Sequence, residues 1–447
     1  MLELVLPQEK LQKQVFILWF ILAVVALAFS GIYSFLPYAL RTPGLSELLD
    51  LKKLFSISLM VHVNLGVLVW FLSSSAMLMT IVTKKNFVPS SLIAFLCAMT
   101  GTIFIIVSPF IGASEAVKSD YVPILHNLVF IFGISIFISG ILLQVILTVF
   151  SFKQVKENIV NFTIYMSSVI FLIAVVCFIQ AAFELRTIVK TRFIDLIEYY
   201  ELLFWGAGHV LQFNYIQLII IVWIIVIGKL CPSIKLCFST WRNLQIINYV
   251  LIIPAVFIYW FYPVDSLQLN EFFTFHMRYF GGLLASLIAT WSCYCLYTNR
   301  KVWIIKLEFI AFCASIFLIL TGGVIGYLIT GANVTIPAHY HGVILGITVG
   351  LMELFYMLLP QMGFKQVNSK LAMWQIILYS VGQFIHILAL AISGGYGVLR
   401  KTPGTEFTLK AKMFMAAMGV GGTIALAGGI LFVVLIFTSM RATKNEQ

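Results

Sequence analysis

The chain has 447 residues, of which 61% are hydrophobic and only 10% are charged. Soluble domains carry roughly a quarter of charged residues, so this composition excludes a soluble protein and indicates one that lies in a lipid bilayer. The formal net charge of +11 comes from basic residues spread along the chain, without the clustered basic face that a nucleic-acid partner requires.

Twelve apolar stretches are each long enough to cross a bilayer as a helix, which takes about 20 residues. In chain order they lie at about 14–37, 54–82, 89–112, 122–152, 160–186, 198–229, 246–262, 270–296, 303–330, 336–360, 371–393 and 410–438. No room remains for a soluble domain, so we expect residues 1–447 to form a single all-α membrane domain. The first residues show no small-residue cleavage site, so we expect no signal peptide to be removed.

Lysine and arginine concentrate in the loops on one side of the predicted bundle, for example at Lys84, Lys85, Arg300 and Lys301. The loops on the other side carry acids and bases in near balance. Because basic loops stay in the cytoplasm, we expect both termini to lie there. The sequence therefore predicts a multi-pass protein of a bacterial-type cytoplasmic membrane.

All seven histidines of the chain fall within the predicted spans and near their outer ends. They are His62, His126, His209, His276, His339, His341 and His386. Polar side chains are costly in a bilayer and are usually functional there. A shared depth indicates a flat or extended ligand at that level, and neutral imidazole is a common axial ligand of haem iron.

The tenth span, "IPAHYHGVILGITVGLMELFYMLLP", holds two of these histidines, His339 and His341. Residues two apart on a helix are separated by about 200°. The two imidazoles therefore face opposite sides, and one helix can ligate two haems, although both may instead serve in packing. The seven cysteines are scattered and no CxxCH occurs, so no haem is expected to be attached through thioethers.

With these motifs, the sequence resembles subunit I of the haem-copper oxidase superfamily, which includes cytochrome oxidases and nitric oxide reductases. "AHYHG" is similar to the paired haem ligands of helix 10, and "LMVHVNLGVLVW" to the helix 2 segment with another haem ligand. "FWGAGHVLQFNY" is similar to the helix 6 segment that binds the non-haem metal, and "SGGYGVLRKTPG" to the loop after helix 11. The resemblance covers the whole chain and implies a twelve-helix bundle.

The resemblance implies two haems and one non-haem metal, either copper or iron. His62 and His341 would be the axial ligands of a low-spin haem. His339 would be the proximal ligand of a high-spin haem whose distal side is open. His209 would face that open side and bind the second metal. Electrons would pass from the low-spin haem to this pocket, where O2 or NO is reduced.

Arg400 and Lys401 match the two basic residues that bind haem propionates in the family, where charge-assisted hydrogen bonds are strong. The chain offers neither a covalent haem nor a copper-thiolate entry site. We therefore expect electrons to come from a donor subunit, a c-type cytochrome or a quinol.

The sequence departs from the family at the non-haem metal. The family supplies an adjacent histidine pair at the end of helix 7, where this chain reads "IYWFYPVD". His276, in "FTFHMRYFGG", is the nearest candidate for a substitute ligand. A divalent metal takes more ligands than two, and Gln212, Asn214 and Glu271 could add oxygen donors.

A second departure concerns a tyrosine that many oxygen-reducing members carry four residues after the helix 6 histidine. Here that position is Phe213, and Tyr279 could replace the missing tyrosine or simply pack at the membrane interface. Reducing two NO to N2O takes two electrons and two protons and needs no such residue. The departures therefore favour NO over O2. Glu353 lies about 18 Å beyond His341 along the helix and could relay protons or hydrogen-bond within the bundle.

Two other classes remain open. A two-haem electron-transfer cytochrome that has lost the non-haem metal would explain the missing ligands. A transporter or channel could move protons or metal ions through the histidines and Glu353, but the sequence shows no inverted repeat or Gly/Pro-broken helix pair of the usual transporter type.

Overall fold

The computed structural model describes residues 2, 4–43, 52–112, 115–155, 158–299, 306–401 and 408–441. Within these ranges, twelve helical segments are long and apolar enough to span a membrane, which confirms the predicted number. They are Lys10–Ala39, Leu54–Val82, Lys85–Phe110, Leu128–Val149, Ile159–Thr191, Leu196–Leu230, Phe238–Trp260, Leu267–Thr298, Leu307–Tyr327, Thr335–Met362, Ser369–Gly395 and Leu409–Arg441.

The chain divides into two compact units, which we describe separately: Met1–Ala26 with Val63–Val302, and Leu27–His62 with Trp303–Gln447. The expectation of a single membrane domain therefore stays a prediction. Helix α1 (Lys10–Ala39) contributes to both units, and the second span passes from one to the other after His62.

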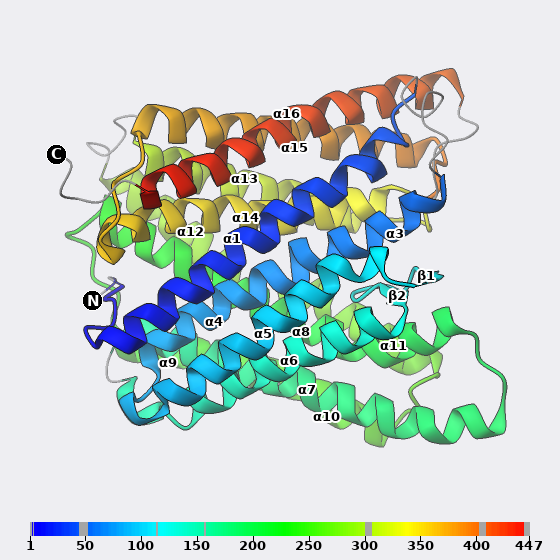
Figure 1. Ribbon diagram of the computed structural model, residues 1–447, viewed down its shortest axis with the longest axis horizontal. Helices are drawn as coiled ribbons and strands as arrows, with labels where there is room; N and C mark the ends of the chain where they lie inside the picture. The colour runs from blue at the N-terminus through cyan, green and yellow to red at the C-terminus, as the bar shows by residue number, and fades with distance from the viewer. Residues whose placement is uncertain are drawn as a thin grey trace. The chain divides into compact units, whose positions relative to one another are not determined.

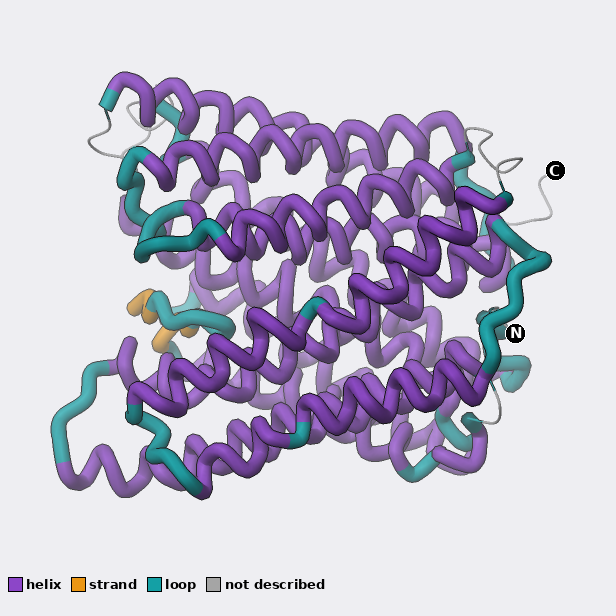
Figure 2. The backbone as a smooth tube through the Cα atoms, turned by 180° about the vertical axis from the view of Figure 1, so that it is seen from behind, coloured by secondary structure: helices purple, strands orange, loops and turns teal. Residues whose placement is uncertain are grey.

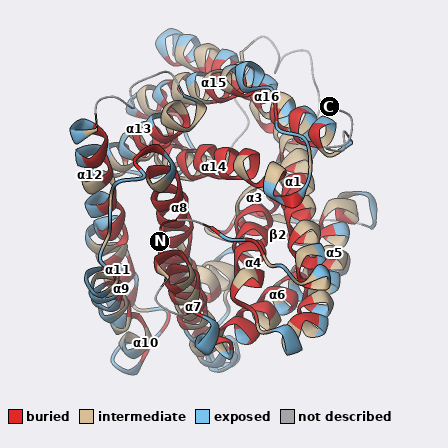
Figure 3. Ribbon diagram, turned by 90° about the vertical axis from the view of Figure 1, so that its left-hand side faces the viewer, coloured by how far each residue is buried: buried red, intermediate tan, exposed pale blue. Residues whose placement is uncertain are grey.

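The first unit is built around α8 (Leu196–Leu230), which is buried along most of its length (Figure 3). This helix is apolar on every side, as expected for one that packs against neighbours all round. The other helices of the unit are α4 (Trp70–Val82), α5 (Val88–Val107), α6 (Leu128–Val149), α7 (Ile159–Thr191), α9 (Phe238–Ile252), α10 (Pro254–Phe257), α11 (Leu267–His276) and α12 (Leu283–Thr298). Short 3-10 turns are η2 (Lys85–Phe87), η3 (Ser108–Phe110), η4 (Phe152–Gln154) and η5 (Ile258–Trp260).

The second unit contains α3 (Lys52–Val63) as far as His62, and four long helices. These are α13 (Leu307–Tyr327), α14 (Thr335–Met362), α15 (Ser369–Gly395) and α16 (Leu409–Arg441). Helices α15 and α16 lie side by side (Figure 1). Helices α13 and α14 touch through glycines, since a Cβ on Gly342 would lie only 2.4 Å from the Cα of Gly322. Such small residues let membrane helices approach closely.

The fourth predicted span begins too early. Helix α6 starts at Leu128 because Asn127 caps it, with its side-chain oxygen accepting from the Phe130 N–H at 2.8 Å. The preceding residues form an antiparallel hairpin of β1 (Glu115–Val117) and β2 (Ile124–His126), coloured orange in Figure 2. His126 is therefore exposed on a strand, and the prediction that all seven histidines lie within spans is wrong for this one.

Candidate functional site

The three predicted haem ligands belong to the second unit, and each is held in the same way. In each imidazole, Nδ1 faces a main-chain carbonyl oxygen: His62 faces Ser30 at 2.9 Å, His339 faces Gly322 at 2.7 Å and His341 faces Pro337 at 2.7 Å. A carbonyl oxygen only accepts, so the proton is assigned to Nδ1 and the lone pair to Nε2. Within the described residues, none of the three Nε2 atoms makes a hydrogen bond.

An imidazole anchored through its N–H, with the other nitrogen free, is the usual arrangement of a metal-ligating histidine. The hydroxyl of Ser30 also lies 3.0 Å from Nδ1 of His62, which further fixes that ring. The residues of the second unit therefore fit the axial ligation of haem.

His341 is the centre of a polar cluster that also contains His386, His62 and Arg41, and that we call the His341 cluster. Its ring lies 5.4 Å from the ring of His386, and it is within electrostatic reach of His62 and Arg41. His386 is itself anchored, since its Nδ1 donates to the carbonyl oxygen of Met418 at 3.1 Å. The depth of His386 indicated a role in sequence, but only the packing of α14 against α15 brings it beside His341.

Arg41 is a member of this cluster that the sequence analysis missed. Its guanidinium carbon lies 5.4 Å from the centre of the Phe55 ring. Burial lowers the pKa of Arg41, yet guanidinium is effectively always charged in proteins. The cluster therefore contains a half-buried positive charge, whose only sequence signal is its position directly after the first span.

The site around His209 lies in the first unit, on α8. Its Nδ1 donates to the carbonyl oxygen of Trp205 at 2.7 Å, and its Nε2 lies 2.9 Å from the hydroxyl oxygen of Tyr121. The side chain of Gln212, a predicted oxygen donor, lies near Tyr121 and acts to lower the pKa of its phenol. A tyrosine outside the predicted set thus engages two of the residues expected at the non-haem metal.

Tyr121 lies at the tip of the β1–β2 hairpin, and the local structure directs it onto α8. Its φ angle is +63°, in the left-handed region that side chains seldom adopt. Its ring packs on α8 where Gly208 has no side chain, and forms an edge-on contact with Trp205 at 5.8 Å. The amide of Asn64 donates to the Pro123 carbonyl oxygen at 2.7 Å and holds the hairpin in place.

His276 ends α11 and is buried among aromatic rings. Its Nε2 donates to the carbonyl oxygen of Leu251 at 2.8 Å, which assigns the proton to that nitrogen. Its Nδ1 is buried and makes no hydrogen bond within the described residues. The rings of Phe213 and Phe272 lie 5.1 Å and 5.4 Å away. Its role as a metal ligand stays a prediction.

The other expected oxygen donors face elsewhere. The Asn214 amide donates to the carbonyl oxygen and the hydroxyl of Ser167, both at 2.8 Å. Glu271 is exposed on α11. Among the described residues, no group of three or more histidine, cysteine, aspartate or glutamate side chains could hold a metal ion. The donors present therefore do not fit a non-haem metal of the family's type.

Two further predicted residues are placed as follows, without a test of their roles. Tyr279 is 53% exposed, with its ring 4.6 Å from Phe275. Glu353 is buried in α14, one turn before Tyr356, which donates to Gln375 at 2.9 Å.

Arg400 and Lys401 follow α15 in a loop whose start is fixed by main-chain contacts. The Val334 N–H donates to the Val398 carbonyl oxygen at 2.9 Å, and Leu399 forms a bridge with Asn333. Residues 402–407 lie outside the described part of the chain. Propionate binding by the two cations stays a prediction.

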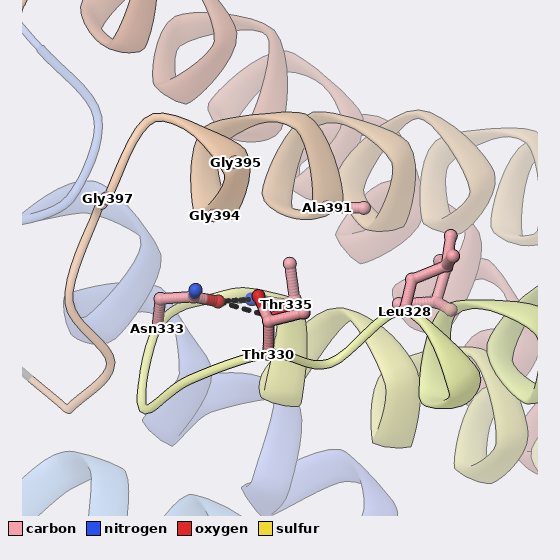
Figure 4. Close-up of a pocket in the computed structure, with 9 residues that line it drawn as sticks. Leu328, Thr330, Asn333, Thr335, Ala391, Gly394, Gly395 and Gly397 are labelled. Carbon is pink, nitrogen blue, oxygen red and sulfur yellow. Dashed lines mark hydrogen bonds between the residues drawn. The ribbon is translucent and has the colours of Figure 1, made fainter.

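A cavity of about 480 Å³ lies beside this loop, between the ends of α13, α14 and α15 (Figure 4). Its lining is Ile325, Leu328, Thr330, Asn333, Thr335, Ala391, Gly394, Gly395 and Gly397, without a titratable side chain. Asn333 accepts a hydrogen bond from the Thr335 N–H at 2.9 Å. The cavity therefore offers hydroxyl and amide groups but no acid–base chemistry of its own.

Two π-helical segments follow predicted ligands closely. Segment η1 (Asn64–Val69) begins two residues after His62, and η6 (Met277–Gly281) begins directly after His276. Such segments insert an extra residue into a helix and are frequent at functional sites. They rotate the following residues relative to a regular helix, which hydrophobic periodicity does not reveal.

The sequence model of cytochrome c and quinol oxidase polypeptide I matches residues 12–440. The chain belongs to this family. It is thus an integral, multi-pass membrane protein and an oxidoreductase of the haem-copper superfamily.

Two relatives are similar along most of their length. One is an uncharacterized protein of Rickettsia prowazekii (strain Madrid E), 33% identical over 494 aligned positions that cover 96% of each chain. The other is an uncharacterized protein of Aquifex aeolicus (strain VF5), 27% identical over 358 positions that cover 79% of this chain and 86% of the relative. Neither name specifies a substrate.

Proposed function

We propose that this chain is the catalytic, haem-bearing subunit of a respiratory terminal reductase in a bacterial-type cytoplasmic membrane. His62 and His341 would hold a low-spin haem that accepts electrons from a donor subunit, a c-type cytochrome or a quinol. His339 would hold a high-spin haem, which would supply the electrons for reduction of a diatomic gas. The common anchoring of these three imidazoles on carbonyl oxygens is the observation that carries the proposal.

The chain's own residues orient and tune the ligands. When bound, haem would supply one-electron chemistry and a place for the gas to bind. The carbonyl oxygens of Ser30, Gly322 and Pro337 fix each ring and raise the basicity of Nε2. The same carbonyl oxygens hold the proton on Nδ1 and leave the lone pair on Nε2.

We propose NO as the gas. Phe213, whose ring packs against His276, stands where many oxygen-reducing members of the family carry a tyrosine. The metal donors around His209 also depart from the three-histidine set of those members. Reduction of two NO to N2O needs two electrons and two protons but no redox tyrosine. O2 is the second candidate, because the phenol of Tyr121 lies 2.9 Å from His209.

The proposal is tested on the detergent-solubilised protein by haem content, reduced-minus-oxidised spectra and gas electrodes. We expect two haems per chain, one low-spin and one high-spin, and NO consumption that exceeds O2 consumption. O2 consumption without NO consumption would transfer the function to the second candidate. Two haems without gas turnover would leave an electron-transfer cytochrome, and a protein without haem would overturn the proposal entirely.

A further inference from the structure

We propose that Tyr121 and His209 form a hydrogen-bonded phenol–imidazole pair in place of the non-haem metal, so that no metal binds at His209. The inference rests on the proposed function and deepens it. It specifies the chemistry of His209, which the family resemblance makes a ligand of the non-haem metal. All of its members lie in the first unit.

The first step concerns the nitrogens of His209, both of which are in use. Nδ1 donates to the Trp205 carbonyl oxygen at 2.7 Å, so the lone pair of the neutral ring is on Nε2. The hydroxyl of Tyr121 donates to that lone pair at 2.9 Å. A metal needs the same lone pair, since histidine binds metals as neutral imidazole. Tyr121 and a metal therefore compete for one atom.

The second step is that the position of Tyr121 is built into the fold. A Cβ on Gly208 would lie 2.2 Å from Cγ of Tyr121, so only glycine admits the ring at this point of α8. The left-handed backbone of Tyr121 costs free energy, and the Asn64 bond to the hairpin helps to maintain it. Gln212 gives the phenol a second polar partner.

The third step is that the remaining metal donors do not converge. The proton-bearing Nε2 of His276 is directed to the Leu251 carbonyl oxygen. Asn214 bonds with Ser167, and Glu271 is exposed. A metal at His209 would need two or three further ligands, and the described residues of this unit do not bring them there.

The pair has a chemistry of its own. A tyrosine phenol ordinarily keeps its proton at neutral pH. The Tyr121 phenol holds that proton in a hydrogen bond to Nε2 of His209. The site offers a proton at Oη where a metal would offer a Lewis acid.

The experiment measures copper and iron per haem by mass spectrometry in protein expressed with both metals supplied. It is combined with a tyrosine vibrational difference spectrum. The proteins are wild type, Tyr121→Phe and His209→Ala, with Tyr294→Phe as the matched control because that tyrosine is exposed and has no proposed role. We expect haem iron alone in the wild type. We also expect a hydrogen-bonded tyrosine band that is absent in Tyr121→Phe, shifted in His209→Ala and unchanged in the control.

One copper or one non-haem iron per chain in the wild type, lost in His209→Ala, would overturn the inference. Loss of that metal in Tyr121→Phe as well would make Tyr121 a ligand, which also contradicts it. A tyrosine band indifferent to His209→Ala would show that the pair does not form. If the wild type holds no haem, the proposed function fails, while metal content and the tyrosine band still decide the inference.

Discussion

A single methyl group on α8 should separate Tyr121 from His209. In Gly208→Ala, the new Cβ would lie 2.2 Å from Cγ and 2.6 Å from Cβ of Tyr121, whereas ordinary contacts are 3.4–4 Å. The ring must therefore withdraw by about 1 Å, since atoms this close repel steeply. The hydroxyl-to-Nε2 distance, now 2.9 Å, would then exceed the range of a good hydrogen bond.

The expected cost follows from three contributions. Overpacking costs about 1–3 kcal/mol, and the lost hydrogen bond costs about 1 kcal/mol. The higher helix propensity of alanine returns about 1 kcal/mol. We therefore expect Gly208→Ala to lower the free energy of unfolding by about 1–3 kcal/mol, and to weaken the hydrogen-bonded tyrosine band.

The assay is denaturant unfolding in detergent micelles, with Gly323→Ala on α13 as the matched control. A Cβ on Gly323 meets nothing within 4 Å, so that variant should be as stable as wild type or slightly more stable. Adding Tyr121→Ala to Gly208→Ala removes the clash, so the two changes should be non-additive. The reasoning is refuted if Gly208→Ala matches the control in stability and retains the tyrosine band.

Three further predictions concern the haems, the Tyr121 proton and a loop thiol. His341→Ala should remove the low-spin signal and His339→Ala the high-spin signal from the reduced-minus-oxidised spectrum, whereas the exposed His126→Ala should preserve both. The raised pKa of Tyr121 means that the folded protein keeps a proton that the unfolded chain loses above about pH 10. Stability should therefore fall as pH rises beyond that value by up to about 1.4 kcal/mol per pH unit, and Tyr121→Phe should lack this part of the slope in unfolding at pH 9 to 11. The pKa of the exposed Cys237 thiol is lowered to about 7 by hydrogen bonds from the Ser239 hydroxyl and from nearby backbone N–H groups. N-ethylmaleimide should therefore label Cys237 at neutral pH, and a Cys237→Ser variant that is labelled just as fast would contradict this assignment.

The twelve helices were predictable because apolar runs are local patterns, and the histidines proposed as haem ligands were singled out by a local pattern as well. Twelve apolar runs fix twelve spans, and an i, i+2 pair such as His339 and His341 must face two sides of any α-helix. The carbonyl partners of the imidazoles also follow locally for His341, whose partner Pro337 is one turn earlier. For His62 and His339, the partners come from other helices and depend on packing.

Tyr121 was missed for a physical reason. It lies 88 residues before His209, in a loop where no periodicity applies, and its direction depends on one left-handed residue and one absent side chain. His276 was located by depth alone. The depth of a residue in the membrane does not specify which way its side chain points around the helix. In the structure, Nε2 of His276 is directed at a main-chain oxygen. Sequence patterns do not predict the side-chain direction of residues in loops and π-helical segments, because tertiary contacts determine it.

The anchoring of the three proposed haem ligands by carbonyl oxygens makes their electronic properties depend on the spacing of the helices. A side-chain substitution cannot delete a main-chain oxygen, so the proton on Nδ1 tolerates extensive change in the surrounding sequence. The bond between His339 and Gly322 instead varies with the distance between α13 and α14, which glycine contacts keep short. A bulkier residue in that seam would move a whole helix and lengthen the bond. The reduction potential of the attached group would then respond to a mutation that touches neither the ligand nor its partner.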